Sequence, residues 1–368
     1  MRVKVGDITK IKTGKLDANA ASEDGEYPFF TCSREPLRIS SYSYDCECVL
    51  VAGNGDLNVK YYNGKFDAYQ RTYIIEDNSN GKLYMPYLYL FMEGYVEELR
   101  HQAIGGVIKY IKLGNLTDAA IELPSVEEQK YIVEILFKTK QVLEHREEEI
   151  KKLDELIKAR FVEMFGGPFQ NPKKWKQISF KKAGKRLSDG PFGSNLKSEH
   201  YTDNGVRVIR LGNIGVGRFI DDDKSYISEE HYETLRKYTC KAGDIVIGTL
   251  GEPNLRACIV PDEVGMAINK ADCVHYVPDE DLLNSVFVCQ YINCPETLLL
   301  AGGMVHGQTR SRVSSGQIAQ LPIFIPPIEL QNEFADFVEQ VDKSKVAVQK
   351  ALNETQTLFA SLMQEYFG

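Results

Sequence analysis

The chain repeats a long stretch of its own sequence. Residues 113–166 reappear without a gap as residues 315–368, so that Gly114 corresponds to Gly316, 202 positions later, and both copies end in Phe-Gly. A repeat of this length indicates two copies of one structural unit. Two copies in one chain form a pseudo-dimer, and a pseudo-dimer is suited to a target that itself has two halves.

Each copy predicts a short strand followed by a long helix. An apolar run ends in proline at residues 119–124 and again at residues 321–326. Behind the proline, apolar residues recur at alternating spacings of three and four, which is typical of a coiled-coil seam. The apolar seam positions are Ile132, Leu136, Leu143, Ile150, Leu153, Ile157 and Met164 in the first copy, and Phe334, Val338, Val341, Val348, Leu352, Phe359, Leu362 and Tyr366 in the second.

Polar residues interrupt the two seams at different places. The interruptions are Thr139, Arg146 and Arg160 in the first copy, and Lys345 and Thr355 in the second. Because each one falls where the other copy is apolar, the two unlike helices fit each other better than either fits its own copy. We predict an intramolecular coiled coil, which in an antiparallel arrangement has a two-fold axis across it. The alternative is two separate helices, each packed on its own domain.

The coil would act as a ruler. Each helix is expected to have about 39 residues, or a length of about 58 Å at about 1.5 Å per residue. In an antiparallel pair, each domain abuts the start of its own helix and the end of the other. The length of the helices would then set the spacing between the two domains.

The blocks in front of the two helices have a mixed α/β pattern. Short β-branched and aromatic runs at residues 48–51 and 244–247 are similarly placed, and glycine-containing turns follow both. The predicted fold class is therefore α+β: two mixed α/β target-recognition domains in a pseudo-two-fold arrangement, joined by two long helices that form an antiparallel coiled coil. The predicted boundaries are 1–124 and 167–325 for the domains, and 125–166 and 326–368 for the helices.

Composition places the chain among cytoplasmic globular proteins. No stretch of about eighteen apolar residues is present to form a membrane span, and the first residues lack the apolar core of a signal peptide. The eight cysteines are scattered without a CxxC pair, which favours buried, reduced thiols. We expect a cytoplasmic protein that does not bind a membrane.

The net charge of −8 is unevenly distributed. Six of the eight excess negative charges lie in residues 125–166 and 326–368, whereas residues 167–325 are close to neutral. Between Pro168 and Ser188 there are six lysines and an arginine but no acidic residue. A local basic patch of this kind is compatible with contact to a DNA backbone, although a run of lysines is also common on a solvated face.

No catalytic or metal-binding pattern is present. The sequence has no GxxxxGK[ST] phosphate loop, no HExxH and no GxSxG nucleophile elbow. It also lacks the (N/D)-P-P-(Y/F) tetrapeptide of DNA amino-methyltransferases, and its six histidines are dispersed. The three aspartates at 221–223 are expected in a solvated loop. We predict a non-catalytic binding protein with no metal site.

Side chains suited to contacting DNA lie in glycine-flanked loops at comparable places in the two blocks. Gln, Asn, Arg, Lys, Ser and Thr can bond base edges or phosphates, and glycine lets a loop approach a groove closely; plain surface turns are the alternative. The candidates are Arg34, Asn54, Arg71, Gln102 and Lys109 in the first block, and Ser194, Asn195, Lys197, Arg207, Arg210, Asn213, Gln308, Thr309, Arg310 and Arg312 in the second.

Several of these segments resemble a known family over essentially the whole chain. Residues 123–129 and 325–331 are similar to the proline-rich entry to each conserved helix in the specificity (S) subunits of type I restriction-modification systems, the HsdS family. Residues 189–194, 209–214 and 307–310 resemble stretches of that family's target-recognition domains. The first block is shorter and lacks a counterpart to residues 190–194, so residue roles are not transferred between the blocks.

The resemblance implies a function. Each target-recognition domain would read one half of a bipartite, asymmetric site in double-stranded DNA, and the helices would set the spacer and dock two methyltransferase (M) subunits. The M subunits would bind S-adenosylmethionine and methylate adenine, and restriction (R) subunits would join to cleave; this chain itself would hold no cofactor. The alternatives are a DNA-recognition subunit of another multiprotein system without methylation, and a coiled-coil scaffold whose domains bind proteins.

Overall fold

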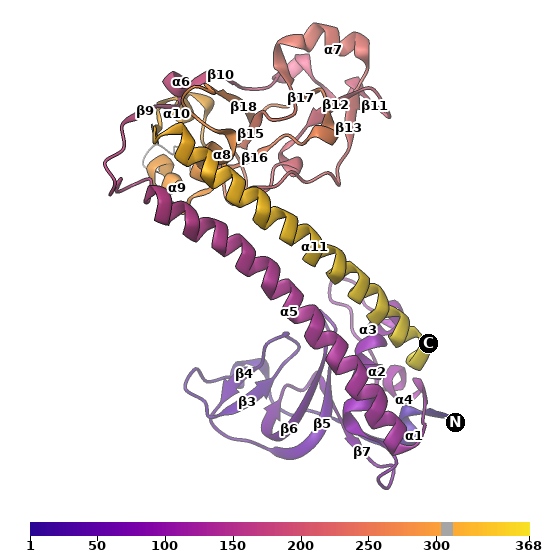
Figure 1. The fold of residues 1–368 in the computed structure, drawn as a ribbon. Helices are drawn as coiled ribbons and strands as arrows, with labels where there is room; N and C mark the ends of the chain where they lie inside the picture. Colours follow the sequence, from indigo (N-terminus) through magenta and orange to yellow (C-terminus); the bar gives the residue numbers. More distant parts are fainter. Residues whose placement is uncertain (303–311) are drawn as a thin grey trace. The chain divides into compact units, whose positions relative to one another are not determined.

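The computed structural model describes residues 1–302 and 312–368, and the chain divides into two compact units. Unit 1 consists of Met1–Glu148 and Gln349–Gly368, and unit 2 of Glu149–Val348. Two 40-residue helices, α5 (Val126–Phe165) and α11 (Ile328–Phe367), each contribute to both units (Figure 1). The boundaries between units therefore fall within the long helices, and not at their ends.

Unit 1 is built on a six-stranded sheet in the order β2-β7-β5-β6-β3-β4. Neighbouring strands are antiparallel except β3 and β6, which are parallel. In the central strand, Val49 pairs with Ile75 on one side and Tyr61 on the other. The strands are β2 (Thr9–Thr13), β3 (Tyr27–Phe30), β4 (Leu37–Ile39), β5 (Tyr44–Ala52), β6 (Val59–Ala68) and β7 (Thr72–Asp77).

Short helices complete the core of unit 1. The most buried of them, α2, has seven of its ten residues inside, including Leu88 and Met92. The remaining elements are β1 (Arg2–Lys4), α1 (Val5–Ile8), η1 (Ala18–Ala20), α2 (Met85–Gly94), α3 (Val96–Gln102), α4 (Leu113–Thr117) and β8 (Ala120–Glu122), and β8 pairs with β1.

Unit 2 contains two larger sheets. The first, with strand order β10-β18-β15-β16, packs with α6, α8 and the long helices in the main core, and the second has the order β11-β13-β12-β17-β14. The strands are β9 (Gln177–Ser179), β10 (Gly184–Ser188), β11 (Tyr201–Thr202), β12 (Val206–Ile209), β13 (Ser225–Ile227), β14 (Thr239–Cys240), β15 (Ile245–Gly248), β16 (Arg256–Ile259), β17 (Ala267–Asn269), β18 (Cys273–Pro278) and β19 (Pro322–Phe324).

The helices of unit 2 are short apart from the two long ones. The α-helices are α6 (Phe180–Ala183), α7 (Glu229–Leu235), α8 (Ser285–Asn293), α9 (Pro295–Gly302) and α10 (Ser315–Gln320). The 3-10 turns are η2 (Gly193–Asn195), η3 (Ser198–His200), η4 (Leu211–Asn213), η5 (Arg236–Tyr238) and η6 (Asp262–Val264).

The two units share one frame. The sheet order β2-β7-β5-β6 of unit 1 recurs as β10-β18-β15-β16 in unit 2, with antiparallel pairing throughout both. In both units two helices, a short helix, a strand and a long helix then follow in the same order. The two runs that the sequence places in parallel become the corresponding central strands β5 and β15. The α+β fold class predicted from the sequence is correct.

The units differ in what is added to this frame. Unit 1 extends the shared sheet with β3 and β4 beyond β6. Unit 2 instead has a separate five-stranded sheet, whose strands all lie between β10 and β18 in chain order. The first block has no sequence counterpart to residues 190–194. In the structure, however, a 3-10 turn follows β2 in unit 1 (η1), as one follows β10 in unit 2 (η2). The second sheet accounts for the greater length of the second block.

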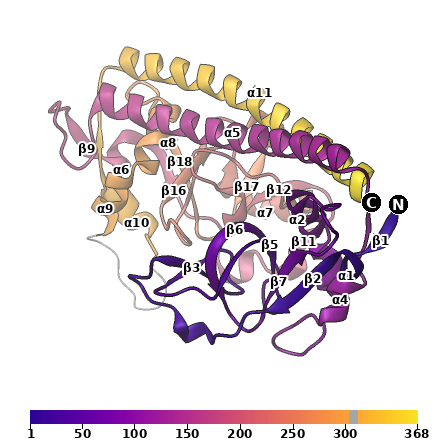
Figure 2. The same cartoon turned by 90° about the horizontal axis from the view of Figure 1, so that it is seen from below.

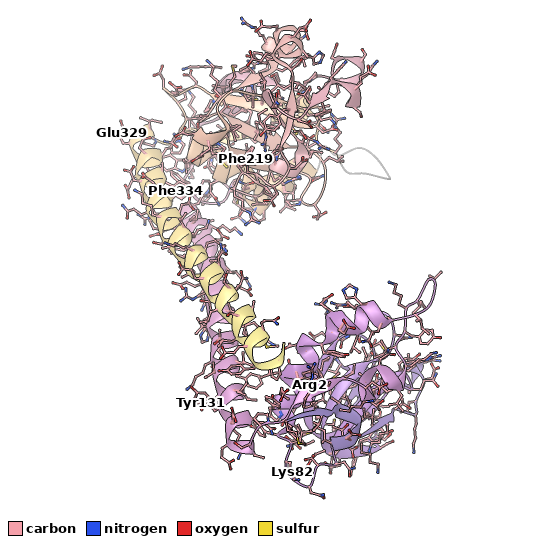
Figure 3. All side chains as sticks on the ribbon, turned by 90° about the vertical axis from the view of Figure 1, so that its right-hand side faces the viewer. Arg2, Lys82, Tyr131, Phe219, Glu329 and Phe334 are labelled. Carbon is pink, nitrogen blue, oxygen red and sulfur yellow. The ribbon has the colours of Figure 1, made fainter. Side chains whose placement is uncertain are left out.

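Within unit 2 the two long helices run antiparallel. Arg160 of α5 pairs with Glu333 of α11 at 3.1 Å, and further back along α5, Asp154 pairs with Lys345 at 2.7 Å. The Phe334 ring contacts the rings of Phe161 and Phe165, with centroid distances of 5.5 and 5.6 Å. Figure 3 labels Phe334 near the start of α11. The seam thus continues into the core of the unit.

The same arrangement holds within unit 1. The start of α5 contributes Ile132 and Leu136 to a core against which Phe359 and Leu362 of α11 pack. The end of α11 reaches α2, where the rings of Phe367 and Tyr87 lie 5.0 Å apart. Figure 2 gives a second view of α5 and α11 side by side. In each unit, therefore, both helices pair with each other and also pack on the domain, which combines the two arrangements considered from sequence.

Burial follows the seam pattern on both helices. The ten heptad positions on each helix, the polar interruptions included, are all buried or partly buried. Thr139 and Thr355 donate hydrogen bonds to carbonyls one turn back, at 2.9 and 2.7 Å. Lys345 also pairs with Asp342, and Arg160 with Glu163. Each of these four side chains has a hydrogen-bond or ion-pair partner, although the Nε of Arg160 is buried without one among the described residues.

A buried glutamine holds the proline turn in front of each long helix by hydrogen bonds. In unit 1, Gln129 accepts from the Tyr84 amide at 2.8 Å and donates to the carbonyls of Lys82 and Pro124. In unit 2, Gln331 accepts from the Asn284 amide and donates to the carbonyls of Leu282 and Pro326, each at 2.9 Å. Both glutamines are fully buried. Each one joins the loop in front of a domain helix to the proline turn, which accounts for their equivalent positions in the repeat.

Replacing Gln331 by alanine is expected to lower the free energy of unfolding by about 2–3 kcal/mol, because a buried amide and two carbonyls lose their partner. Gln349→Ala on the same helix is the matched control, since that side chain is exposed and its hydrogen bond is to Asn353, one turn further along the helix. Urea unfolding of both variants measures the difference. Equal midpoints for the two variants would show that the glutamine does not hold the entry turn.

The eight cysteines are free, and six of them are buried. Burial raises the pKa of the Cys258 and Cys273 thiols to about 12. Such thiols stay protonated and unreactive at neutral pH. Along the described part of the chain, none of the helices combines the length and apolar character needed to cross a membrane.

Candidate nucleic-acid interface

Four loops of unit 1 that carry predicted DNA-contacting residues meet at one place. The turn at residues 53–58 is central: the Gly53 amide bonds the Arg71 carbonyl at 2.8 Å, and the Gly55 amide bonds the Lys109 carbonyl at 3.0 Å. Asn58 in this turn donates to the Cys32 carbonyl at 2.9 Å, which ties down the loop that carries Arg34. The structure thereby brings Arg34, Asn54, Arg71 and Lys109 together, although they lie far apart in the sequence.

The charges in this cluster are partly neutralised. Asp56 pairs with Arg34 at 2.9 Å and with Arg100 at 3.2 Å, and the hydrogen bond from Arg34 lowers the pKa of the Asp56 carboxyl. Arg71 and Lys109 are exposed. With the one carboxylate of this turn held by two arginines, the cluster presents cationic side chains to solvent, as a phosphate-binding surface requires.

Gln102 lies at the contact between α3 and α4. Its amide donates to Glu98 at 2.7 Å and to the Tyr95 hydroxyl at 3.2 Å, and accepts from Asn115 at 2.9 Å. These bonds connect α3 to α4. The side chain is half-buried and its hydrogen-bonding groups are occupied within the unit.

Three of the candidates in unit 2 hold the aspartate loop at residues 221–223. Arg207 is buried and donates to Asp221 at 2.6 Å and to the Asp223 carbonyl at 2.9 Å. Asn213 is fully buried and donates to the same carbonyl at 2.8 Å. Arg210 pairs with Asp223 at 2.9 Å. Arg207 and Asn213 therefore shape the surface from inside, and only Arg210 remains partly exposed.

The aspartate loop is accordingly an ion-paired structure. Lys224 donates to Asp221 and, together with Arg207, lowers the pKa of its carboxyl. Across residues 1–302 and 312–368, no group of three or more His, Cys, Asp or Glu side chains is arranged to hold a metal ion. The acidic run that stands out in the sequence is thus tied to neighbouring cations.

Ser194, Asn195 and Lys197 lie on an exposed segment of unit 2 around η2 and η3. Two histidines form hydrogen bonds with the backbone of this segment. His231 bonds the Asn195 carbonyl at 2.9 Å, and His200 accepts from the Lys197 amide at 3.1 Å, with the two rings 4.0 Å apart. The three side chains are available to a ligand, although Lys197 also lies 3.4 Å from Glu199.

The last group of candidates is only partly described. Gln308, Thr309 and Arg310 lie outside the described residues. Arg312 pairs with Asp272 at 2.8 Å and is partly exposed. The basic run between Pro168 and Ser188 has its six lysines exposed.

Sequence reasoning did not single out Arg256, which organises the loops of unit 2. Its guanidinium donates to four carbonyls, those of Leu211, Ile214, Leu250 and Pro253, at 2.6–3.1 Å. These carbonyls belong to two separate loops. No local pattern marks an arginine for this role, because it joins a nearby loop to carbonyls 42 and 45 residues away in the chain.

The structure predicts a large effect for one arginine substitution and a small one for one lysine substitution in unit 2. Arg207→Met is expected to lower the free energy of unfolding by about 2 kcal/mol, because two part-buried hydrogen bonds, to Asp221 and to the Asp223 carbonyl, are lost. Lys197→Met at the exposed segment should leave stability within about 0.5 kcal/mol. Thermal unfolding of the two variants measures this. Equal melting temperatures would contradict the structural role of Arg207.

The two units thus carry different exposed polar loops on a common frame. Residues 1–154 match the family model described as the type I restriction modification DNA specificity domain. The type I restriction enzyme EcoDI specificity subunit of Escherichia coli is 40% identical over 156 residues, which is 42% of this chain and 34% of that protein. This chain therefore matches about a third of the length of that relative.

Other similarities extend over the whole chain. The type I restriction enzyme MjaVIII specificity subunit of Methanocaldococcus jannaschii is 23% identical, with 97% of this chain and 91% of that protein covered. The crystal structure of the S subunit of a type I restriction-modification system from M. genitalium has the same fold, with a TM-score of 0.60 at 15% identity, and covers 100% of this chain and 96% of that one. Residues 1–154 of this chain are therefore similar to type I restriction-modification DNA specificity domains, and the whole chain is similar in fold to a solved S subunit.

Proposed function

We propose that this chain is the DNA sequence-specificity subunit of a type I restriction-modification complex. Each unit would read one half of a bipartite, asymmetric site in double-stranded DNA. The observation that carries the proposal is the contrast between the two units: the frame is repeated, whereas the added strands and loops differ. A repeated frame with different loops is suited to two unlike half-sites.

The long helices would set the spacing between the half-sites and dock two methyltransferase subunits. Exposed apolar side chains on both helices support docking, because such groups can be buried against a protein partner. They are Tyr131, Val142, Leu156 and Val162 on α5, and Val346 and Leu358 on α11, each at least 40% exposed. The acidic excess of the helices also suits a surface that faces protein and not phosphate.

Chemistry would belong to the partner subunits. The methyltransferase subunits would bind S-adenosylmethionine and methylate adenine, and restriction subunits would cleave DNA. This chain would contribute recognition and geometry, and we propose a cytoplasmic location for the complex. The exposed apolar residues of the helices also favour a second candidate, a protein-binding scaffold without DNA recognition.

Methylome sequencing of the host with and without this gene tests the proposal. We expect one asymmetric bipartite methyladenine motif to disappear when the gene is deleted. A methylome that is identical in both strains would contradict the proposed function. The scaffold alternative predicts that the complex with methyltransferase does not bind duplex DNA, whereas the proposed function predicts binding that weakens steeply with salt.

A further inference from the structure

A loop of unit 1 carries two apolar side chains at its exposed tip. Val107 is 104% exposed relative to a free residue and Ile108 is 62% exposed. Gly105 and Gly106 precede them and Lys109 follows. Neither apolar side chain belongs to the core of the unit. The tip of this loop therefore presents apolar surface to solvent beside a cation.

The base of the loop is held firmly. Ile104 and Tyr110 exchange two backbone hydrogen bonds, at 3.0 and 2.8 Å. The Lys109 carbonyl accepts from Gly55, and the Ile111 amide donates to the Gly53 carbonyl at 2.9 Å. Gly105 has a φ of 122°, a conformation that other residues rarely adopt, and so permits the tight turn. The apolar tip is thus a projection from an anchored base.

We propose that Val107 and Ile108 form a wedge that enters between neighbouring base pairs of the half-site contacted by unit 1. This inference rests on the proposed function, because it takes DNA as the ligand. Proteins that deform DNA insert apolar side chains between base steps and partly unstack them. Valine and isoleucine suit this use since branching at the β-carbon stiffens the side chain, and little freedom is lost on insertion.

The residues around the loop favour DNA as the ligand that the tip contacts. Lys109 lies next to the tip, and the turn to which the loop is bonded also holds the loops of Arg34 and Arg71. A phosphate backbone on either side of the wedge would meet these cations. The wedge adjoins the candidate nucleic-acid interface through the bonds between the base of its loop and the turn at residues 53–58.

The small size of the apolar tip also favours DNA as its ligand. A stable protein–protein interface buries about 800 Å² on each partner, far more than two neighbouring side chains on a loop can supply. A base-step wedge needs only one or two apolar side chains. The tip therefore fits a DNA step better than the surface of a partner protein.

The test uses the complex of this chain with its methyltransferase subunits. Duplexes that contain the methylated motif carry 2-aminopurine at successive positions of each half-site, because this base fluoresces more strongly when it is unstacked. We expect the wild-type complex to raise the fluorescence at one step. Val107→Ser with Ile108→Ser should abolish that rise and weaken binding about tenfold, since two apolar side chains are no longer buried.

The control variant keeps the apolar character of the tip. Val107→Leu with Ile108→Leu should retain the fluorescence rise and most of the affinity. A serine variant that binds with wild-type affinity and still unstacks the step would overturn the wedge. A serine variant that no longer co-purifies with the methyltransferase would also overturn it, because the tip would then contact protein.

The outcome for the wedge is separable from that for the proposed function. A wild-type complex that binds its motif specifically but unstacks no step rules out the wedge and leaves the proposed function standing. A wild-type complex that binds no duplex contradicts the proposed function itself. Because the tip is exposed, all variants are expected to unfold at the wild-type urea concentration.

Discussion

Replacing Phe334 by alanine is expected to lower the free energy of unfolding of unit 2 by about 3–5 kcal/mol. The side chain is fully buried where α11 meets the end of α5. Its ring packs edge-on against Phe161 and Phe165, and all three belong to the main core of the unit. Alanine leaves a cavity that is shared by the coiled coil and the domain, and the surrounding rings relax only in part.

Val346→Ala on the same helix is the control for this substitution. Val346 is 71% exposed, so that its truncation should change the free energy of unfolding by no more than about 0.5 kcal/mol. Urea unfolding of the full chain, followed by circular dichroism, compares the two variants. Similar midpoints would mean that the seam contributes little to unit 2, and would argue against the packing described for α5 and α11.

The second large effect concerns the spacing of the DNA half-sites. Adding seven residues to both long helices, after Glu147 in α5 and at the matching place in α11, preserves the heptad seam. The helices lengthen by about 10.5 Å at about 1.5 Å per residue. Since base pairs are about 3.4 Å apart, we expect the spacer of the methylated motif to grow by about three base pairs. Methylome sequencing of a strain with this variant measures the spacer directly.

A four-residue insertion in α5 alone is the matched contrast. Four residues do not complete a heptad, and they shift one seam against the other. Charged residues then meet apolar ones beyond the insertion. We expect a changed spacer or loss of the assembled complex, measured by methylome sequencing and by sizing. An unchanged spacer in the seven-residue variant would refute the view that the helices act as a ruler.

The repeated frame could be predicted from the sequence because its signals are local. The heptad seam, the proline turns and the runs at residues 48–51 and 244–247 depend on residues close together in the chain. A seam position is buried whenever its helix pairs. Apolar residues at alternating spacings of three and four are therefore sufficient to locate the seam. The two 40-residue helices agree with the predicted length of about 39 residues.

The candidate interface could be predicted only in part. Residue type identified Arg34, Asn54, Arg71 and Lys109, which the fold brings together. The same criterion selected Arg207 and Asn213, which are buried in the unit and donate hydrogen bonds to the loop at residues 220–223. An arginine that holds a loop and an arginine that contacts a phosphate have the same chemistry. Only the direction of the side chain separates them.

Two copies of one frame, and the pairing of two unlike helices through complementary seams, could both be predicted from the sequence. Both properties follow from periodic patterns along the chain, and these patterns can be recognised without knowing which distant residues come into contact. The tertiary structure alone decided which polar side chains face inward, where the fully buried Gln129 finds partners 45 and 47 residues away, and which loops meet around residues 53–58. The physical reason is that a buried polar group must be hydrogen-bonded, and its partners come from whichever segments the fold brings within reach.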